Sequence, residues 1–230
     1  MSFEGDRPFL VTALLAQCSE GADADSWWAA PVGARIAALL RLTELSDRQA
    51  TLELTLRCPH AACHAGFDVS LPIDQLIAHA TRVDRIPVSL PDGQVLIVRP
   101  PTGDDLRRWS RASYPTPHAA IVGMTDALVV EGQVSDDDGA TLSVIETALA
   151  EHDPLVDFTV SCVCPTCAVP SEIGLDLERV ALDRLTAIRA ALLDEVHVLA
   201  SAYGWSEREI LGIAPERRGR YRDLINGAPR

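Results

Sequence analysis

The sequence predicts an α+β fold, and three observations support this prediction. Two cysteine knuckles, Cys58-Pro-His-Ala-Ala-Cys63 and Cys164-Pro-Thr-Cys167, lie about one hundred residues apart in the chain. Alternating apolar and polar residues flank both knuckles, which is typical of half-buried β-strands. Apolar residues at intervals of three or four over residues 176–202 indicate a long amphipathic helix. We therefore expect discontinuous β-hairpins, an inserted segment with a hairpin and helices, and a C-terminal helical region.

The knuckles supply four thiols, which is the ligand set that a tetrahedral structural zinc ion takes. Residues 51–72 and 157–177 are therefore predicted to form the two halves of one zinc-ribbon-like module. Closing a loop of this length costs about 4 kcal/mol, whereas a structural zinc site contributes about 10 kcal/mol or more. The predicted zinc ligands are Cys58, Cys63, Cys164 and Cys167.

The longer C-x4-C spacing of the first knuckle leaves its ligand set open, and His60, His64 or Cys162 are alternatives for one cysteine. The second knuckle also has the spacing of a redox pair. Redox motifs place their first cysteine at a helix N-terminus, but here Val169-Pro170 and a strand-like run follow, which favours a metal site.

Composition restricts the classes of partner. The chain has 230 residues and a formal net charge of −13, and all of its 20 cationic residues are arginine. This charge argues against nucleic acid or an anionic membrane as the main partner. The N-terminus lacks the pattern of a signal peptide, and no apolar run reaches the length of a membrane span. We expect one compact unit over residues 1–230, located in the cytoplasm, with protein partners.

The first third of the chain predicts two helices before the first hairpin. Pro8 is suited to the first turn of a helix that runs to Cys18, and Pro31 is suited to opening a helix through Leu42. Trp27-Trp28 is expected in the linker between them, either covering the edge of the core or contacting a partner. A short helix is expected after the hairpin, from Asp74 to near Ala80.

Residues 82–156 are predicted as an insertion between the halves of the module. A tight turn at Pro91-Asp92-Gly93 joins two strand-like runs, and Thr102-Gly-Asp-Asp105 resembles a helix capping box. Three aspartates near residue 137 are interpreted as a solvated loop, because their spacing lacks the full calcium-loop pattern. The expected elements are strands Ile86–Leu90 and Gln94–Arg99, helices from Thr102 through Trp109 and Pro117–Val130, an acidic loop Ser135–Asp138, and a helix Thr141–His152.

Residues 178–225 are predicted to be helical. Gly204 is placed to end the long helix in a left-handed cap. The pattern Ser206-x-x-Glu209 is a capping box for a short helix ending at Gly212, and Pro215 begins a last helix through Ile225.

The end of the chain permits a second interpretation, a helix-turn-helix with arginines nearby, which together with a zinc ribbon suggests a DNA-binding transcription regulator. Glu207 and Glu209 stand near the N-terminus of its recognition helix, where DNA phosphates and base edges would lie, and they disfavour this reading.

The combination of parts resembles a more specific group. The paired knuckles, Arg99-Pro-Pro-Thr-Gly-Asp-Asp-Leu106, the segment Glu195–Leu211 and the segment Pro215–Ile225 are similar to the T-even-phage-like baseplate hub assembly family. Members of that family are encoded with contractile phage tails and related injection systems. The resemblance implies a non-enzymatic role in assembling the baseplate hub and spike, either as a chaperone or as a retained minor component.

Aromatic and arginine side chains in the last helices are the types enriched at interface hot spots. An alternative is that the aromatic rings pack the last helices onto the long one. No nucleophile motif or phosphate-binding loop accompanies the acid–base pairs His152-Asp153 and Glu195 with His197, so we expect no enzyme activity and no small-molecule substrate. The predicted partner-binding residues are Trp205, Tyr221, Arg217 and Arg218.

Overall fold

The computed structural model describes residues 6–80, 83–91, 93–133 and 139–227. It confirms an α+β fold with small antiparallel sheets and a helical C-terminal region. The contacts form two compact units, Met1–Leu182 and Asp183–Arg230, where the sequence analysis expected one. The boundary falls inside the long helix α8 (Leu177–Tyr203), because the C-terminal part of α8 packs with the two short helices that follow it.

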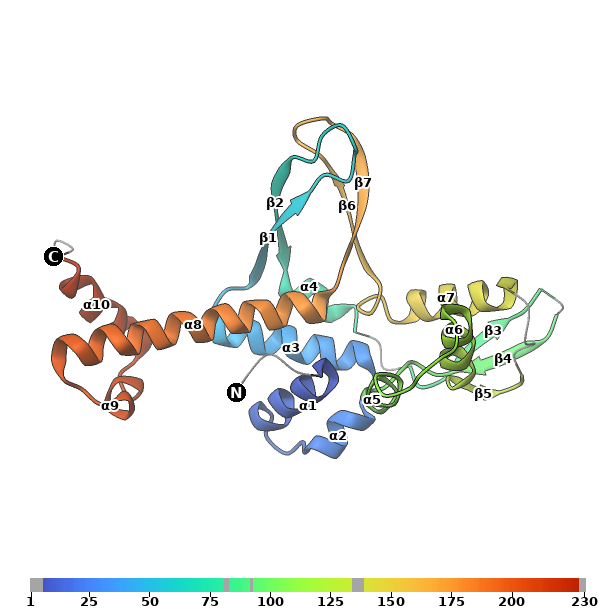
Figure 1. The fold of residues 1–230 in the computed structure, drawn as a ribbon, viewed down its shortest axis with the longest axis horizontal. Coiled ribbons are helices and arrows are strands. Elements are labelled where there is room, and N and C mark those ends of the chain that lie inside the picture. Colours follow the sequence, from blue (N-terminus) through green and yellow to red (C-terminus); the bar gives the residue numbers. More distant parts are fainter. Residues whose placement is uncertain (1–5, 81–82, 92, 134–138, 228–230) are drawn as a thin grey trace. The chain divides into compact units, whose positions relative to one another are not determined.

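The N-terminal helices of the first unit form a small helical core. Helices α1 (Arg7–Cys18) and α3 (Val32–Asp47) begin close to the predicted positions, and both pack with other N-terminal elements (Figure 1). Trp27 and Trp28 do not lie in a linker, because they belong to helix α2 (Ala24–Ala29), which Asp23 caps through the Ser26 N–H. Trp28 is buried, and its ring meets the Phe9 ring edge-on at 4.9 Å.

Arg35 lies fully buried at the centre of this helical core. Its guanidinium donates to the Thr12 hydroxyl, to the Trp27 carbonyl and to the Pro8 carbonyl at 2.6–3.0 Å. The buried charge is therefore hydrogen-bonded rather than left alone, as a buried cation requires.

Two antiparallel hairpins carry the cysteine knuckles at their turns. The first pairs β1 (Thr51–Arg57) with β2 (Gly66–Pro72), and the second pairs β6 (Phe158–Val163) with β7 (Pro170–Leu175). Each is a separate two-stranded sheet, and Figure 1 shows their turns at the same end. The short helix α4 (Ile73–Ala78) follows the first hairpin as predicted.

The inserted segment contains a three-stranded sheet in the order β3 (Ile86–Ser89), β4 (Val95–Val98), β5 (Val129–Glu131). The predicted helix Pro117–Val130 is too long, because α6 ends at Asp126 and the next residues pair with β4 instead. Helix α7 (Gly139–His152) packs on this sheet through Ile145. Helix α5 (Gly103–Trp109) has the predicted capping box. The predicted acidic loop Ser135–Asp138 lies outside the described residues.

The second unit follows the prediction closely. Gly204 ends α8 with a φ of 70°, and its N–H donates to the Ala200 carbonyl. Ser206 and Glu209 form the capping box of α9 (Glu207–Leu211), and α10 (Pro215–Ile225) begins at proline. The arrangement satisfies helix ends that would otherwise leave backbone groups without partners.

Candidate metal centre

Four cysteine sulfurs from the two hairpin turns gather in one cluster. The Sγ atoms of Cys58, Cys63, Cys164 and Cys167 all lie within 4.8 Å of one another. Cys58 Sγ lies 3.7 Å from Cys167 Sγ, and Cys63 Sγ lies 3.8 Å from Cys164 Sγ. Sulfurs bound tetrahedrally at about 2.3 Å from a metal are separated by about 3.8 Å. The cluster therefore has the dimensions of a four-thiolate metal site, and all four predicted ligands contribute to it.

Strand alternation places one cysteine of each pair inside. Along β1 the alternate residues Leu52, Leu54 and Leu56 are buried or half-buried, and Cys58 continues this series at the start of the turn. Cys164 continues the inward series of β6 in the same way. Because side chains on a strand alternate between its two faces, each strand delivers its first cysteine to the inner side. Cys58 and Cys164 are consequently buried, whereas Cys63 and Cys167 are partly exposed.

The two turns use the same backbone device to present the second cysteine. The residue after it is left-handed in both turns, with φ of 51° at His64 and 56° at Ala168. The first cysteine N–H then donates across the turn, from Cys58 to the Ala65 carbonyl and from Cys164 to the Val169 carbonyl. The first turn is two residues longer, and its additional residues are accommodated before the left-handed position.

The electrostatics of the cluster favour a bound cation. A hydrogen bond from the Cys167 N–H outweighs burial and lowers the pKa of the Cys164 thiol to about 6. At Cys58 a backbone N–H from His60 acts in the lowering direction, but burial and the neighbouring thiols raise its pKa to about 12. At Cys63 the Ala65 N–H acts to lower the pKa of the thiol. Burial and hydrogen bonds with the Cys167 and Cys164 thiols outweigh it, so the pKa is raised. A divalent cation allows all four thiols to ionise together, because it compensates their mutual repulsion.

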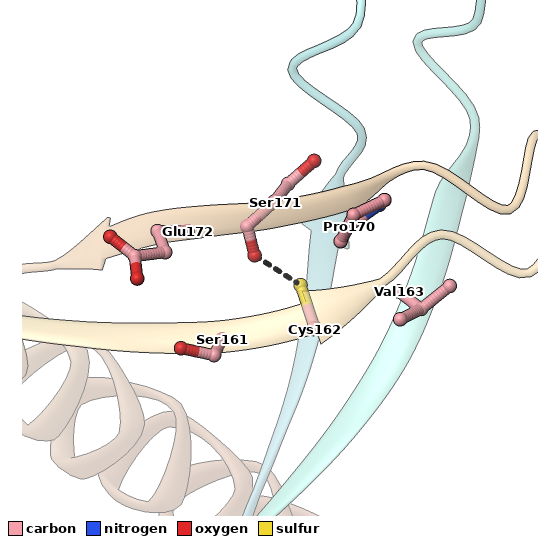
Figure 2. A pocket seen from close by; sticks show the side chains of 6 residues that line it. All are labelled: Ser161, Cys162, Val163, Pro170, Ser171 and Glu172. Atoms are coloured by element: carbon pink, nitrogen blue, oxygen red, sulfur yellow. Dashed lines mark hydrogen bonds between the residues drawn. The ribbon is translucent and has the colours of Figure 1, made fainter.

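The alternative ligands for the first knuckle do not join the four-sulfur cluster found among the described residues, where neither His60 nor His64 is a member. Figure 2 shows Cys162 in a shallow surface depression on β6 and β7, where its thiol points toward the Ser171 carbonyl at 3.7 Å. Cys162 therefore makes a contact within its own hairpin. Cys18 is exposed at the end of α1.

The predicted partner-binding residues occupy the second unit. The rings of Tyr203 and Trp205 stack with centroids 4.6 Å apart, and the Tyr221 ring meets both edge-on. Arg217 donates to the Tyr221 hydroxyl at 3.2 Å and stays exposed. The internal-packing alternative thus describes part of what these rings do, although Tyr203 keeps an exposed face.

Arg218 differs from its neighbour Arg217 because it is buried. Its Nε donates to Glu195 at 2.9 Å and its Nη1 donates to the Ile213 carbonyl at 2.8 Å. These bonds hold α10 against α8, so the structure gives Arg218 a role inside the second unit.

One long-range helix cap was not predicted from the sequence. Asp153 Oδ2 accepts a hydrogen bond from the Gly33 N–H at 3.1 Å, across 120 residues. Gly33 lies in the first turn of α3, whose N-cap residue Pro31 offers no side-chain cap. A carboxylate at this position stabilises the positive end of the helix. No local pattern signals such a contact, since Gly33 precedes the first hairpin and Asp153 lies near the end of the inserted segment.

No protein-family model, curated protein or solved structure matches this chain. None of the helices in the described part of the chain combines the length and apolar character needed to cross a bilayer.

Proposed function

We propose that the four-cysteine cluster binds one zinc ion and that this ion is structural. Sulfur ligands favour zinc, copper(I) and iron–sulfur chemistry, and a mononuclear four-thiolate tetrahedron is typical of structural zinc. Four protein ligands leave no open position for water or substrate, so a catalytic role is not expected. The sulfur separations of 3.7 and 3.8 Å carry this proposal.

Elemental analysis of the purified protein tests the metal assignment. We expect about one zinc per chain, lost in Cys164→Ser and retained in Cys18→Ser, whose thiol is exposed on α1. Iron with visible absorbance, or no metal in the freshly purified protein, would reject the zinc proposal.

We further propose that the protein is a non-enzymatic assembly factor, or a minor component, of the baseplate hub in a contractile phage-tail-like injection system. The closing segments that carry the family resemblance form α9, α10 and the end of α8. This proposal rests on that resemblance.

The character of the second unit supports a protein partner. Residues 183–230 contain eight arginines and seven acidic residues, whereas residues 1–182 contain twelve arginines and twenty-six acidic residues. Arg217, the partly exposed aromatic rings and the exposed Leu211 and Leu224 offer mixed apolar and cationic contacts. Surfaces of this composition are typical of interface hot spots.

The DNA-binding alternative receives less support from the second unit. Helix α9 has five residues, and Glu207 and Glu209 stand in its first turn. A recognition helix places its N-terminal residues against bases and phosphates, where these carboxylates would be repelled.

Co-expression with the hub and spike proteins encoded beside this gene tests the functional proposal. We expect a tagged chain to retain at least one of them, and Trp205→Ala to weaken the complex about 30-fold, as a hot-spot residue does. Arg217→Glu provides a second variant that keeps all three rings and removes the hydrogen bond to Tyr221, and Leu45→Ala provides an exposed control in the first unit. The proposal fails if no hub, spike or baseplate protein is retained, or if salt-sensitive binding to DNA is found instead.

A further inference from the structure

Helices α6 and α7 border an open groove in the first unit, with a volume of about 410 Å³. Ile121, Met124 and Thr125 line it from α6, at intervals of three and one along the chain. On α7 the lining residues recur from Leu142 to Ala150 at helical spacing, so one face of that helix borders the groove. This face is about 12 Å long, which corresponds to about two helical turns.

The groove is apolar, and it is open to solvent in the part of the chain that the structure describes. Helix α6 has no buried residue, although most of its residues are apolar. Ile121 is 53% exposed and Val156, another residue that lines the groove, is 43% exposed. An apolar helix face normally packs against a core, and a concave exposed apolar surface is the type of site in which an amphipathic helix of another protein packs.

The charged groups along the groove have one sign. Its lining residues include Glu146, Asp153 and Asp157 and contain no arginine, lysine or histidine. Asp153 is buried, and its Oδ1 has no hydrogen-bond partner among the described residues. Burial raises the pKa of this carboxyl, although the Gly33 and Leu155 N–H groups act in the opposite direction. The groove therefore combines an apolar surface with carboxylates that lack a cationic partner within it.

We propose that the α6–α7 groove binds an amphipathic helix of a partner protein, with an apolar face on Ile121, Met124 and Leu149 and flanking arginine or lysine side chains toward Glu146 and Asp157. This interface is separate from the metal cluster and does not depend on the hub proposal. A second copy of this chain is disfavoured as the occupant, because residues 1–182 carry a large excess of negative charge.

Binding of a designed helical peptide tests the proposal. The probe is a labelled peptide of about 18 residues with leucine at i, i+3, i+4 and i+7 positions and arginine elsewhere. A counterpart with glutamate in place of arginine is the charge control. We expect the arginine peptide to bind the full-length protein and the glutamate peptide to bind at least about tenfold more weakly. Equal binding of both peptides would reject the charge complementarity.

Matched variants locate the binding site. Ile121→Asp should weaken binding of the arginine peptide about tenfold, whereas Val95→Asp, at a residue of similar exposure on β4, should not. The pair Glu146→Gln and Asp157→Asn should weaken binding, whereas Glu20→Gln and Asp25→Asn, with the same change in net charge, should leave it unchanged.

Two outcomes would overturn the proposal. Equal loss of binding in both charge-neutralised pairs would assign the binding to the net charge of the protein. Concentration-dependent dimers in sedimentation that Ile121→Asp abolishes would assign the groove to a second copy of the chain.

Discussion

The paired hairpins and the N-terminal helical core are stabilised in different ways. Helix α3 alone buries eight residues, including the fully buried Arg35. In the four strands of the two hairpins, Leu52 and Leu56 are the buried residues, and the other inward positions are half-buried. An isolated two-stranded hairpin is marginal in water. The comparison indicates that the helical core rests on packing and hydrogen bonds, whereas the hairpins rest on the sulfur cluster at their turns.

Removing the proposed zinc ion should have the largest effect and should separate the two regions. Structural zinc contributes about 10 kcal/mol or more, so chelation should increase hydrogen exchange at the Cys58 and Cys164 N–H groups by orders of magnitude. Amides inside α3 should keep most of their protection. Hydrogen exchange followed by NMR or mass spectrometry measures both regions in one experiment. Unchanged protection in the hairpins would show that packing alone holds them.

Gly33→Ala should damage the helical core rather than the hairpins. A Cβ at this position would lie 1.8 Å from Asp153 Oδ1, so the capping carboxylate must move and the helix end loses its cap. We expect a loss of about 2–4 kcal/mol in the free energy of unfolding, measured by urea denaturation. Gly174→Ala on β7, where open space surrounds the new Cβ, is the matched control. An equal loss in both variants would contradict the role of the cap.

Asp105 in α5 should make the stability of the first unit sensitive to acid. It is fully buried and accepts hydrogen bonds from Arg99 at 2.5 and 3.0 Å. Burial raises its pKa, but hydrogen bonds from Arg99 and Thr102 outweigh burial and hold the pKa below its usual value. The stabilisation from this shift is therefore complete above about pH 4 and is lost as the pH falls through the lowered folded-state pKa.

Asp105→Asn should accordingly lower the free energy of unfolding by about 2 kcal/mol near neutral pH, as the loss of a charged hydrogen-bond acceptor does, and by less at about pH 2.5. Urea denaturation of chelated wild-type and variant protein at both pH values keeps the metal out of the comparison. If the loss in the free energy of unfolding does not depend on pH, Asp105 stabilises the fold through its shape and not through its charge.

The left-handed residues should give the smallest effects. Ala168 and His64 in the hairpin turns and Arg48 at the end of α3 all have φ near 55°. Replacing each with glycine relieves the left-handed strain but increases the entropy of the unfolded chain. The expected net increase in the free energy of unfolding is about 0.5 kcal/mol. Ala168→Gly should increase stability in urea only while the metal is bound, whereas Arg48→Gly should do so with or without it. A gain at Ala168 in chelated protein would show that the turn forms on its own.

Sequence patterns over a few neighbouring residues predicted the hairpins and the helix starts, because contacts between residues close in the chain determine these elements. The cysteine spacing and the strand alternation identified both hairpins, and the capping boxes at Thr102 and Ser206 identified two helix starts. The four ligands were predicted because each thiol pair is local, although the longer first knuckle left His60, His64 and Cys162 as alternatives for one cysteine. These features need no knowledge of the tertiary structure.

The missed features depend on distant residues. Strand β5 has three residues and is defined by its pairing with β4, which residues 129–131 do not encode alone. Helix α2 was read as a linker because six residues with two tryptophans carry no helical period, whereas packing against Phe9 and Arg107 stabilises it. The Asp153–Gly33 cap likewise joins residues 120 positions apart.

The separation of the knuckles has a consequence for synthesis of the chain on the ribosome. Cys63 and Cys164 are 101 residues apart, so at about 5–20 residues per second the first thiol pair is made about 5–20 s before the second. During this interval the nascent chain presents only half a set of ligands. If the cluster binds zinc as proposed, producing the protein requires that the first two thiols stay reduced, and that metal be supplied, until the second pair has been made.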